Sequence, residues 1–239
     1  MDKDRILQSL SVLKKHDKKL TIFGASGHRY ALNPPLSPEQ VDGFESGHGV
    51  VLPDDYKLFI CEIGNGGAGP YHGVFPFGFH DDGDSLCGWA EGGLVGDPAK
   101  PFPHDAAWNL PESFWDQEPN PPEGTPEEEL DKLYEEWDAR LQRDYWNPGI
   151  MDGAIPICHV GCALRVWLVI NGARKGELWA DDRADNGGVH PLQGKTGGSV
   201  TFGGWYCDWL EDALGQFGVT TPVSGIRPGW WARIWGGRR

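Results

Sequence analysis

Long apolar runs are missing from this sequence, and so are the marks of secretion. No segment approaches the roughly 18 consecutive apolar residues that a membrane-spanning helix requires. Residues 1–20 are charged throughout and contain no apolar core of a signal peptide. We therefore expect a cytoplasmic protein that has no membrane partner.

Cysteine is scarce and odd in number, which is a poor match to the paired cysteines of a secreted disulfide framework. We expect reduced and mostly buried thiols instead. The five cysteines are scattered along the chain, at Cys61, Cys87, Cys158, Cys162 and Cys207.

Basic residues are also in short supply, because 21 Lys and Arg face 35 Asp and Glu, a formal net charge of −14. This sign disfavours nucleic acid and anionic membranes as partners and suits a basic protein. The whole excess lies in residues 80–150, which hold 18 acidic and four basic side chains, whereas the rest of the chain holds 17 of each. The segment is also rich in proline, which favours loops over sheet. The sequence predicts an acidic insertion here and leaves open whether it is structural or functional.

One helix is predicted within this insertion. Thr125, Pro126 and Glu128 fit a capping box, in which the first side chain and the third helical residue bond each other's backbone. An apolar stripe at helical spacing follows, formed by Leu130, Leu133, Tyr134, Trp137 and Leu141. We assign the acidic side chains of this helix to a partner-binding surface, namely Glu127, Glu128, Glu135 and Glu136.

Aromatic residues are plentiful, and twelve Trp, ten Phe and six Tyr can fill a sizeable core. We expect one domain over residues 1–217 and a tail rich in Gly, Pro, Trp and Arg over residues 218–239. Such a tail can pack as an extra strand or stay mobile. The acidity of the remainder argues against a nucleic-acid-binding role for it.

Residues 52–79 organise the chain. An apolar stripe at i, i+3, i+4 and i+7 predicts a short helix after Pro53, and Gly64 is expected to end it in the left-handed conformation. A glycine-rich loop leads from there to extended chain over residues 71–79. The stripe consists of Tyr56, Phe59, Ile60 and Ile63.

Helical spacing also predicts an N-terminal helix over residues 4–20 and a last helix from Thr201 to about residue 217. Ser37 and Gln40 form a second capping-box pattern, which predicts a helix that starts between them. Three apolar runs bounded by turn signals predict strands, at residues 155–160, 164–170 and 176–180.

These segments resemble a known family. The run LPDDYKLFI…IGNGGAGPYHGVFPF is similar to the signature of the SMI1/KNR4 family, also called the SUKH superfamily. IPICHVGC…VWLVING…GELWADDRADNGGVHPL and TFGGWYCDWLEDAL resemble its central sheet and its C-terminal helix, in the same order. The resemblance implies an α+β fold in which N-terminal helices pack on a mostly antiparallel sheet that a C-terminal helix closes. It also implies a non-enzymatic binding protein, since the family serves mostly as bacterial immunity proteins that neutralise toxin domains.

None of the candidate motifs for catalysis or cofactor binding has the spacing and the neighbouring secondary structure that its chemistry requires. Residues 64–69 fit G-x-G-x-x-G, yet a helix precedes them and Pro70 follows, whereas a dinucleotide site needs a strand before and a helix after. Residues 188–196 miss the P-loop spacing by one residue. Cys158 and His159 point to opposite faces of a strand and lack a second pair at zinc spacing. We expect no catalytic residue, no cofactor and no metal.

A charged cluster follows the third strand, with Glu177, Asp181 and Asp182 near Arg183. Two interpretations stay open. Asp182, Arg183 and their neighbours can form a structural ion pair that holds the strand end, or the three carboxylates can face a partner.

The leading hypothesis is a non-catalytic immunity protein whose acidic insertion steers a basic toxin domain, for example a nuclease. A second hypothesis is a regulatory or scaffold module of the same fold with a cellular partner other than a toxin. A third, disfavoured one is a hydrolase whose site lies within residues 177–185.

Overall fold

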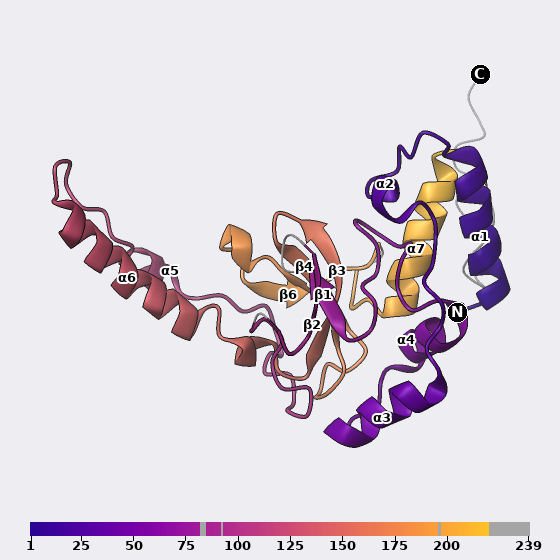
Figure 1. The fold of residues 1–239 in the computed structure, drawn as a ribbon, viewed down its shortest axis with the longest axis horizontal. Coiled ribbons are helices and arrows are strands. Elements are labelled where there is room, and N and C mark those ends of the chain that lie inside the picture. The colour runs from indigo at the N-terminus through magenta and orange to yellow at the C-terminus, as the bar shows by residue number, and fades with distance from the viewer. Residues whose placement is uncertain (82–84, 92, 196, 220–239) are drawn as a thin grey trace.

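Helices occupy both ends of the molecule and an antiparallel sheet lies between them (Figure 1). The computed structural model describes residues 1–239 except 82–84, 92, 196 and 220–239, so most of the predicted tail at 218–239 lies outside the described residues. The described helices are α1 (Lys3–His16), α2 (Ala25–His28), α3 (Pro38–His48), α4 (Asp54–Leu58), a π-helical turn η1 (Phe59–Ile63), α5 (Glu112–Trp115), α6 (Glu127–Asp144), the 3₁₀ turns η2 (Pro148–Met151) and η3 (Arg183–Asp185), and α7 (Phe202–Gly215). The strands are β1 (Phe79–Asp81), β2 (Leu86–Gly88), β3 (Ala154–Gly161), β4 (Leu164–Val169), β5 (Leu178–Asp181) and β6 (Val189–Pro191).

The main sheet has the order β3-β4-β5-β6, and every pair in it is antiparallel. The three predicted strands are confirmed as β3, β4 and β5, whereas β6 was not predicted. Both outer strands gain a further partner: Val74 bridges Cys158 of β3, and Trp108 bridges Val189 of β6. A separate hairpin pairs β1 with β2. The fold is therefore mixed α+β with two antiparallel sheets.

One face of the sheet carries the main hydrophobic core, formed with α1, α4 and α7. The predicted stripe of α1 is fully used, because Ile6, Leu10 and Leu13 are buried, although this helix ends at His16 rather than near residue 20. The last helix is confirmed, and Thr201 caps it by accepting a hydrogen bond from the Gly204 N–H. The capping box of α3 is also present. On the sheet side this core contains Ile155, Ile157, Cys158, Val166, Leu168 and Leu178.

The stretch after Pro53 corrects one expectation. The helix changes to π-helical geometry over η1, and Gly64 then has φ 177°, which is extended and not left-handed. The left-handed residues are Gly66 and Gly67, with φ of 77° and 102°. A Cβ at position 64 would lie 2.7 Å from the Leu32 Cβ, so close packing and not backbone conformation requires glycine there.

The turn after α1 is organised by Asp17, whose side chain is buried. Its carboxylate accepts four hydrogen bonds, from the Thr21 and Ile22 N–H groups and from the Thr21 and Tyr30 hydroxyls. Burial by itself raises the pKa of Asp17, but these hydrogen bonds outweigh it and lower the pKa to about 2. The N-terminal helices are thus joined around one ionised carboxylate.

The acidic insertion supplies the second core, on the opposite face of the sheet. Trp167, Val169 and Trp179 point to this face and are fully buried. Phe102, from the first half of the insertion, and Met151, directly after its last residue, cover them. Leu94, Val95, Trp108 and Ile150 pack against this cluster. The parts of the insertion that lie against the sheet therefore belong to the packed body.

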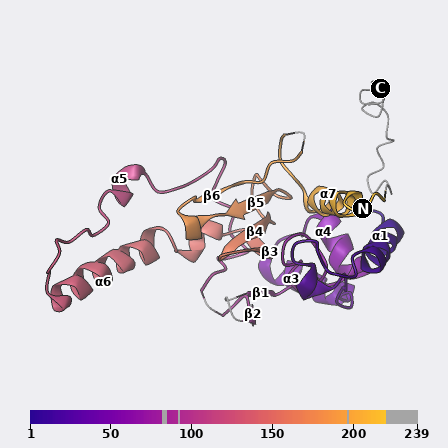
Figure 2. The same cartoon turned by 90° about the horizontal axis from the view of Figure 1, so that it is seen from above.

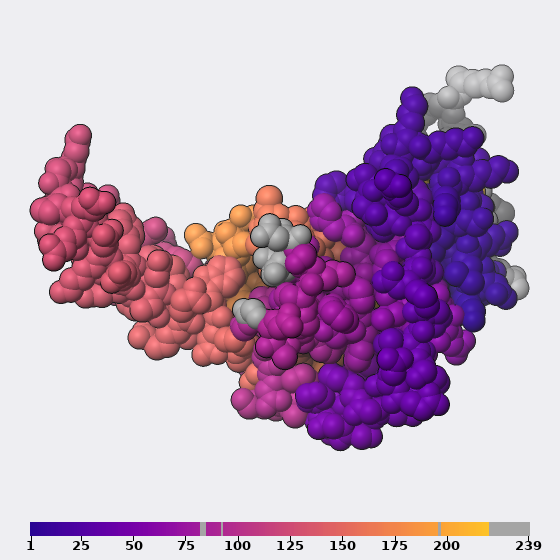
Figure 3. Space-filling model, viewed as in Figure 1, coloured from indigo at the N-terminus to yellow at the C-terminus, as the bar shows by residue number. Residues whose placement is uncertain are grey.

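The middle of the insertion forms an arm, which we define as residues 109–147. Its helices α5 and α6 extend away from the body, on the side of the sheet opposite α1 and α7 (Figure 2). The space-filling view shows the arm projecting at one end of an otherwise thicker molecule (Figure 3). The predicted capping box is wrong, because Pro126 is the N-cap and the Thr125 hydroxyl donates to the Pro122 carbonyl instead.

Among the described residues, no helix has the combination of length and apolar character that crossing a bilayer demands.

Candidate functional site

The first two thirds of α6 present an array of carboxylates that no cation of the described residues pairs with. Residues 127–138 include seven Asp and Glu but only one basic residue, Lys132. All eight of these side chains are exposed. Within the described part of the chain, none of them takes part in an ion pair. The predicted partner-binding residues Glu127, Glu128, Glu135 and Glu136 belong to this array.

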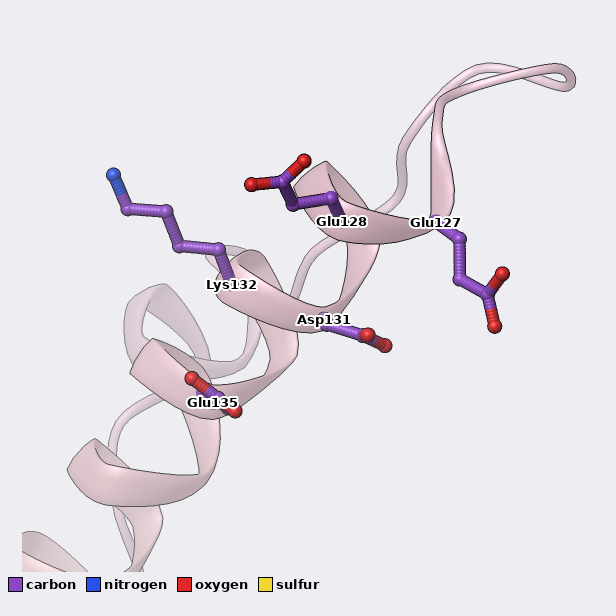
Figure 4. A pocket seen from close by; sticks show the side chains of 5 residues that line it. All are labelled: Glu127, Glu128, Asp131, Lys132 and Glu135. Carbon is purple, nitrogen blue, oxygen red and sulfur yellow. The ribbon is translucent and has the colours of Figure 1, made fainter.

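This surface is convex. Figure 4 shows the side chains of Glu127, Glu128, Asp131, Lys132 and Glu135 fanning outward from a single helix. The space of about 520 Å³ that lies against them is bounded by α6 alone. Such a surface does not enclose a small ligand, and it suits contact with another macromolecule.

A small aromatic core holds the arm together. Phe114 of α5 and Trp137 of α6 are buried, with ring centroids 5.0 Å apart. The Arg140 guanidinium lies over both rings, 5.0 Å from the Phe114 centroid and 5.4 Å from that of Trp137. Of the predicted apolar stripe of α6, only Trp137 is buried, and Leu133 and Tyr134 remain 36% and 43% exposed.

A buried ion pair attaches the C-terminal end of the arm to the sheet. The Arg183 Nε and Nη2 donate to the two carboxylate oxygens of Asp181, each over 2.7 Å. Arg183 Nη1 donates to the carbonyl of Tyr145, directly after α6, over 2.9 Å. The guanidinium also stacks over Trp146. Arg183 is 1% exposed and Asp181 4%, so this network (the clamp) is withdrawn from solvent.

The Tyr145 side chain extends the clamp. Burial raises its pKa, so the phenol stays neutral, and its oxygen accepts the Gly188 N–H over 3.0 Å. Its ring stacks on Trp108 and meets Trp115 edge-on. Several arm residues thus converge on the η3–β6 segment of the sheet.

The N-terminal end of the arm is fixed to the same segment. Trp108 and Val189 exchange two backbone hydrogen bonds of 2.8 Å. The Asn109 side chain donates to the Asn186 carbonyl over 2.7 Å. Gly188 has φ 72°, and a Cβ there would lie 2.1 Å from the Trp108 carbonyl oxygen, so glycine is required for this approach. Both ends of the arm are therefore pinned next to each other.

The second group of predicted site residues is not brought together. Asp181 belongs to the clamp, and its burial excludes it from a partner surface in this conformation. The structural ion pair expected of Asp182, Arg183 and their neighbours forms between Arg183 and Asp181. Asp182 itself lies near His190, with 2.9 Å between its Oδ2 and the His190 Nε2. Glu177 precedes β5, Asp182 follows it, and Glu177 lies 3.5 Å from Arg174. Glu177 and Asp182 therefore lie at opposite ends of one strand.

Cys158 and His159 have separate surroundings in the structure. Cys158 is buried in the main core, where burial raises the pKa of its thiol, so it stays protonated. His159 lies instead 3.4 Å from the Asp81 carboxylate. Among the described residues no three His, Cys, Asp or Glu side chains cluster as metal ligands do.

Compared with known proteins, the chain matches no protein family, no curated protein and no solved structure.

Sequence reasoning missed the clamp. Arg183 two residues after an acidic strand end is a visible signal for a local ion pair, but Tyr145 lies 38 residues away. Two further signals were available: a Tyr-Trp pair directly after a charged helix, and a Trp preceding Asn109 in a proline-rich loop.

Proposed function

We propose that this chain is a cytoplasmic, non-catalytic binding protein of the SMI1/KNR4 type that neutralises a toxin domain by direct contact. The observation that carries the proposal is the arm: a convex acidic surface, without ion pairs among the described residues, that is fixed to the sheet at both ends. A surface that serves only the fold has no need of seven carboxylates along one helix that pair with nothing in the described part of the chain.

The distribution of the resemblance supports the same proposal. The motifs that resemble the family fall on α4 and the glycine loop, on β3 to β6, and on α7, and they supply much of the main core. The arm is an addition to that body. A shared body with a variable attached element is what a family that binds many targets requires.

The proposed mechanism is steering followed by occlusion. The negative potential of the arm raises the encounter rate with a basic partner, and the arm then covers the partner's functional surface. Because potentials of exposed charges are screened beyond about 10 Å at 0.1 M salt, association should slow as salt rises.

The direct test uses the product of the adjacent gene. Co-expression should restore growth to cells that produce that product, and the purified proteins should form a complex. No protection and no complex would contradict the immunity proposal. A regulatory or scaffold module with another basic cellular partner is the second candidate, favoured by the same acidic arm, and a gene neighbourhood without a toxin-like product would select it.

A further inference from the structure

One aromatic side chain stands out on the acidic arm because it is large and 43% exposed: Tyr134. Its hydroxyl reaches the Pro119 carbonyl only over a long 3.5 Å, so the ring lies along the loop before α6 with part of its surface in solvent. Tyrosine of this kind often anchors protein interfaces, because it offers a rigid apolar surface at a small entropic cost.

The carboxylates next to Tyr134 have a regular arrangement. Asp131 precedes it by three residues and Asp138 follows it by four, and both are exposed and unpaired among the described residues. These spacings put both carboxylates on the same side of the helix as the ring, with Cβ atoms about 5–6 Å apart. An aromatic face flanked by two carboxylates on one margin of α6 is therefore open to solvent.

This combination matches the chemistry of arginine. A guanidinium can stack on an aromatic face and at the same time donate two parallel hydrogen bonds to a carboxylate, whereas an ammonium offers no plane to stack. The arm already contains such stacking, since the Arg140 guanidinium lies over Phe114 and Trp137.

We infer that Tyr134, with Asp131 and Asp138, receives arginine side chains of a basic protein partner. The inference rests on the proposed function, which it deepens by naming the side chain recognised. It also predicts a partner that presents arginine side chains, whereas attraction by charge alone would accept lysine equally well.

The opposite margin of α6 provides a matched control. Leu133 is 36% exposed and lies between Glu129, four residues before it, and Glu136, three residues after it. This site has the same pair of carboxylates and a similar exposure, but it has no aromatic face. Any arginine preference that depends on stacking should vanish on Tyr134→Leu and survive Leu133→Ser.

The experiment uses the full chain and two labelled peptides of equal length and charge, one of arginine and one of lysine, at low ionic strength. Fluorescence anisotropy should give about two- to fivefold tighter binding of the arginine peptide, the size of an exposed cation–π contact. Amide shifts in NMR spectra should map to α6. Tyr134→Leu should abolish the preference and leave lysine-peptide binding unchanged.

Equal affinities for the two peptides, a preference that persists in Tyr134→Leu, or shifts that map away from α6 would overturn the inference. These outcomes are separable from failure of the proposed function, because the peptides need no natural partner. If the adjacent gene product fails to bind while the arginine preference holds, the immunity proposal fails and the arginine site stands. If that product binds wild type and Tyr134→Leu equally well, the role of Tyr134 is contradicted.

Discussion

The clamp and the carboxylate array of α6 differ in how their charges are neutralised. At the clamp, Arg183 and Asp181 are almost fully buried and satisfy each other through two short hydrogen bonds. On residues 127–138 of α6, seven carboxylates are exposed and unpaired within the described residues. A buried charge must find its partner inside the chain, whereas an exposed one is free to find it elsewhere. The comparison assigns the clamp to architecture, and it motivates the proposed binding role of the arm surface.

The largest effect should come from breaking the clamp. Arg183→Met leaves the buried Asp181 carboxylate without its cation, with only the backbone N–H of residue 183 as a donor. We expect a loss of about 3–5 kcal/mol in the free energy of unfolding. Arg143→Met is the matched control, because Arg143 pairs with Asp144 at the surface with 67% of its side chain exposed, and it should cost at most about 0.5 kcal/mol. Urea titration measures both, and a loss of no more than about 0.5 kcal/mol for Arg183→Met, the size of a surface change, would refute the distinction.

A medium effect is expected from the other buried carboxylate, Asp17. Its pKa falls from the ordinary 3.8 to about 2 on folding. A lowered pKa contributes stability that is present above about pH 4 and disappears as pH falls through about 2. Asp17→Asn should therefore lower the free energy of unfolding by about 2 kcal/mol at pH 7, and its difference from wild type should shrink on acidification.

Unfolding curves at about pH 7, above both pKa values, and at about pH 2.5, between them, would measure this difference. A penalty for Asp17→Asn that stays constant with pH would show that the hydrogen bonds do not depend on the ionised carboxylate.

Regular periodicity and turn signals predicted much of the body. The stripe of Ile6, Leu10 and Leu13 and the strands around Val166 follow spacings that depend only on neighbours in the sequence. The conformation of Gly64 was wrong because its cause is a contact with Leu32, which no local pattern reveals. Likewise, β6 is three residues long and is held from both sides, by β5 and by Trp108.

Part of the candidate site could likewise be predicted from local sequence, and part could not. The acidity of α6 is a property of composition, so its exposed carboxylates could be predicted, including Glu127 and Glu136. The fate of Asp181 could not, because its burial depends on Tyr145 and Trp146 arriving from another part of the chain. Local sequence identifies a charged group, and only tertiary packing decides whether that group faces inward or outward.

The smallest effect on stability should come from neutralising the arm surface. Replacing Glu127, Glu128, Glu135 and Glu136 by Gln removes no ion pair among the described residues. The free energy of unfolding should therefore change by at most about 1 kcal/mol, because relief of repulsion among the carboxylates offsets the lost interaction of Glu127 and Glu128 with the helix dipole. A loss of more than 2 kcal/mol (well beyond a surface change) in urea titration would assign these carboxylates to the scaffold.

The same variant tests the central claim most directly, through its association rate with the adjacent gene product measured by stopped flow at low and at high salt. If the arm steers a basic partner, the variant should associate at least about tenfold more slowly than wild type at low salt. The difference should narrow at high salt, with little change in the dissociation rate. Equal association rates at low salt would contradict the assignment of the arm as the binding surface.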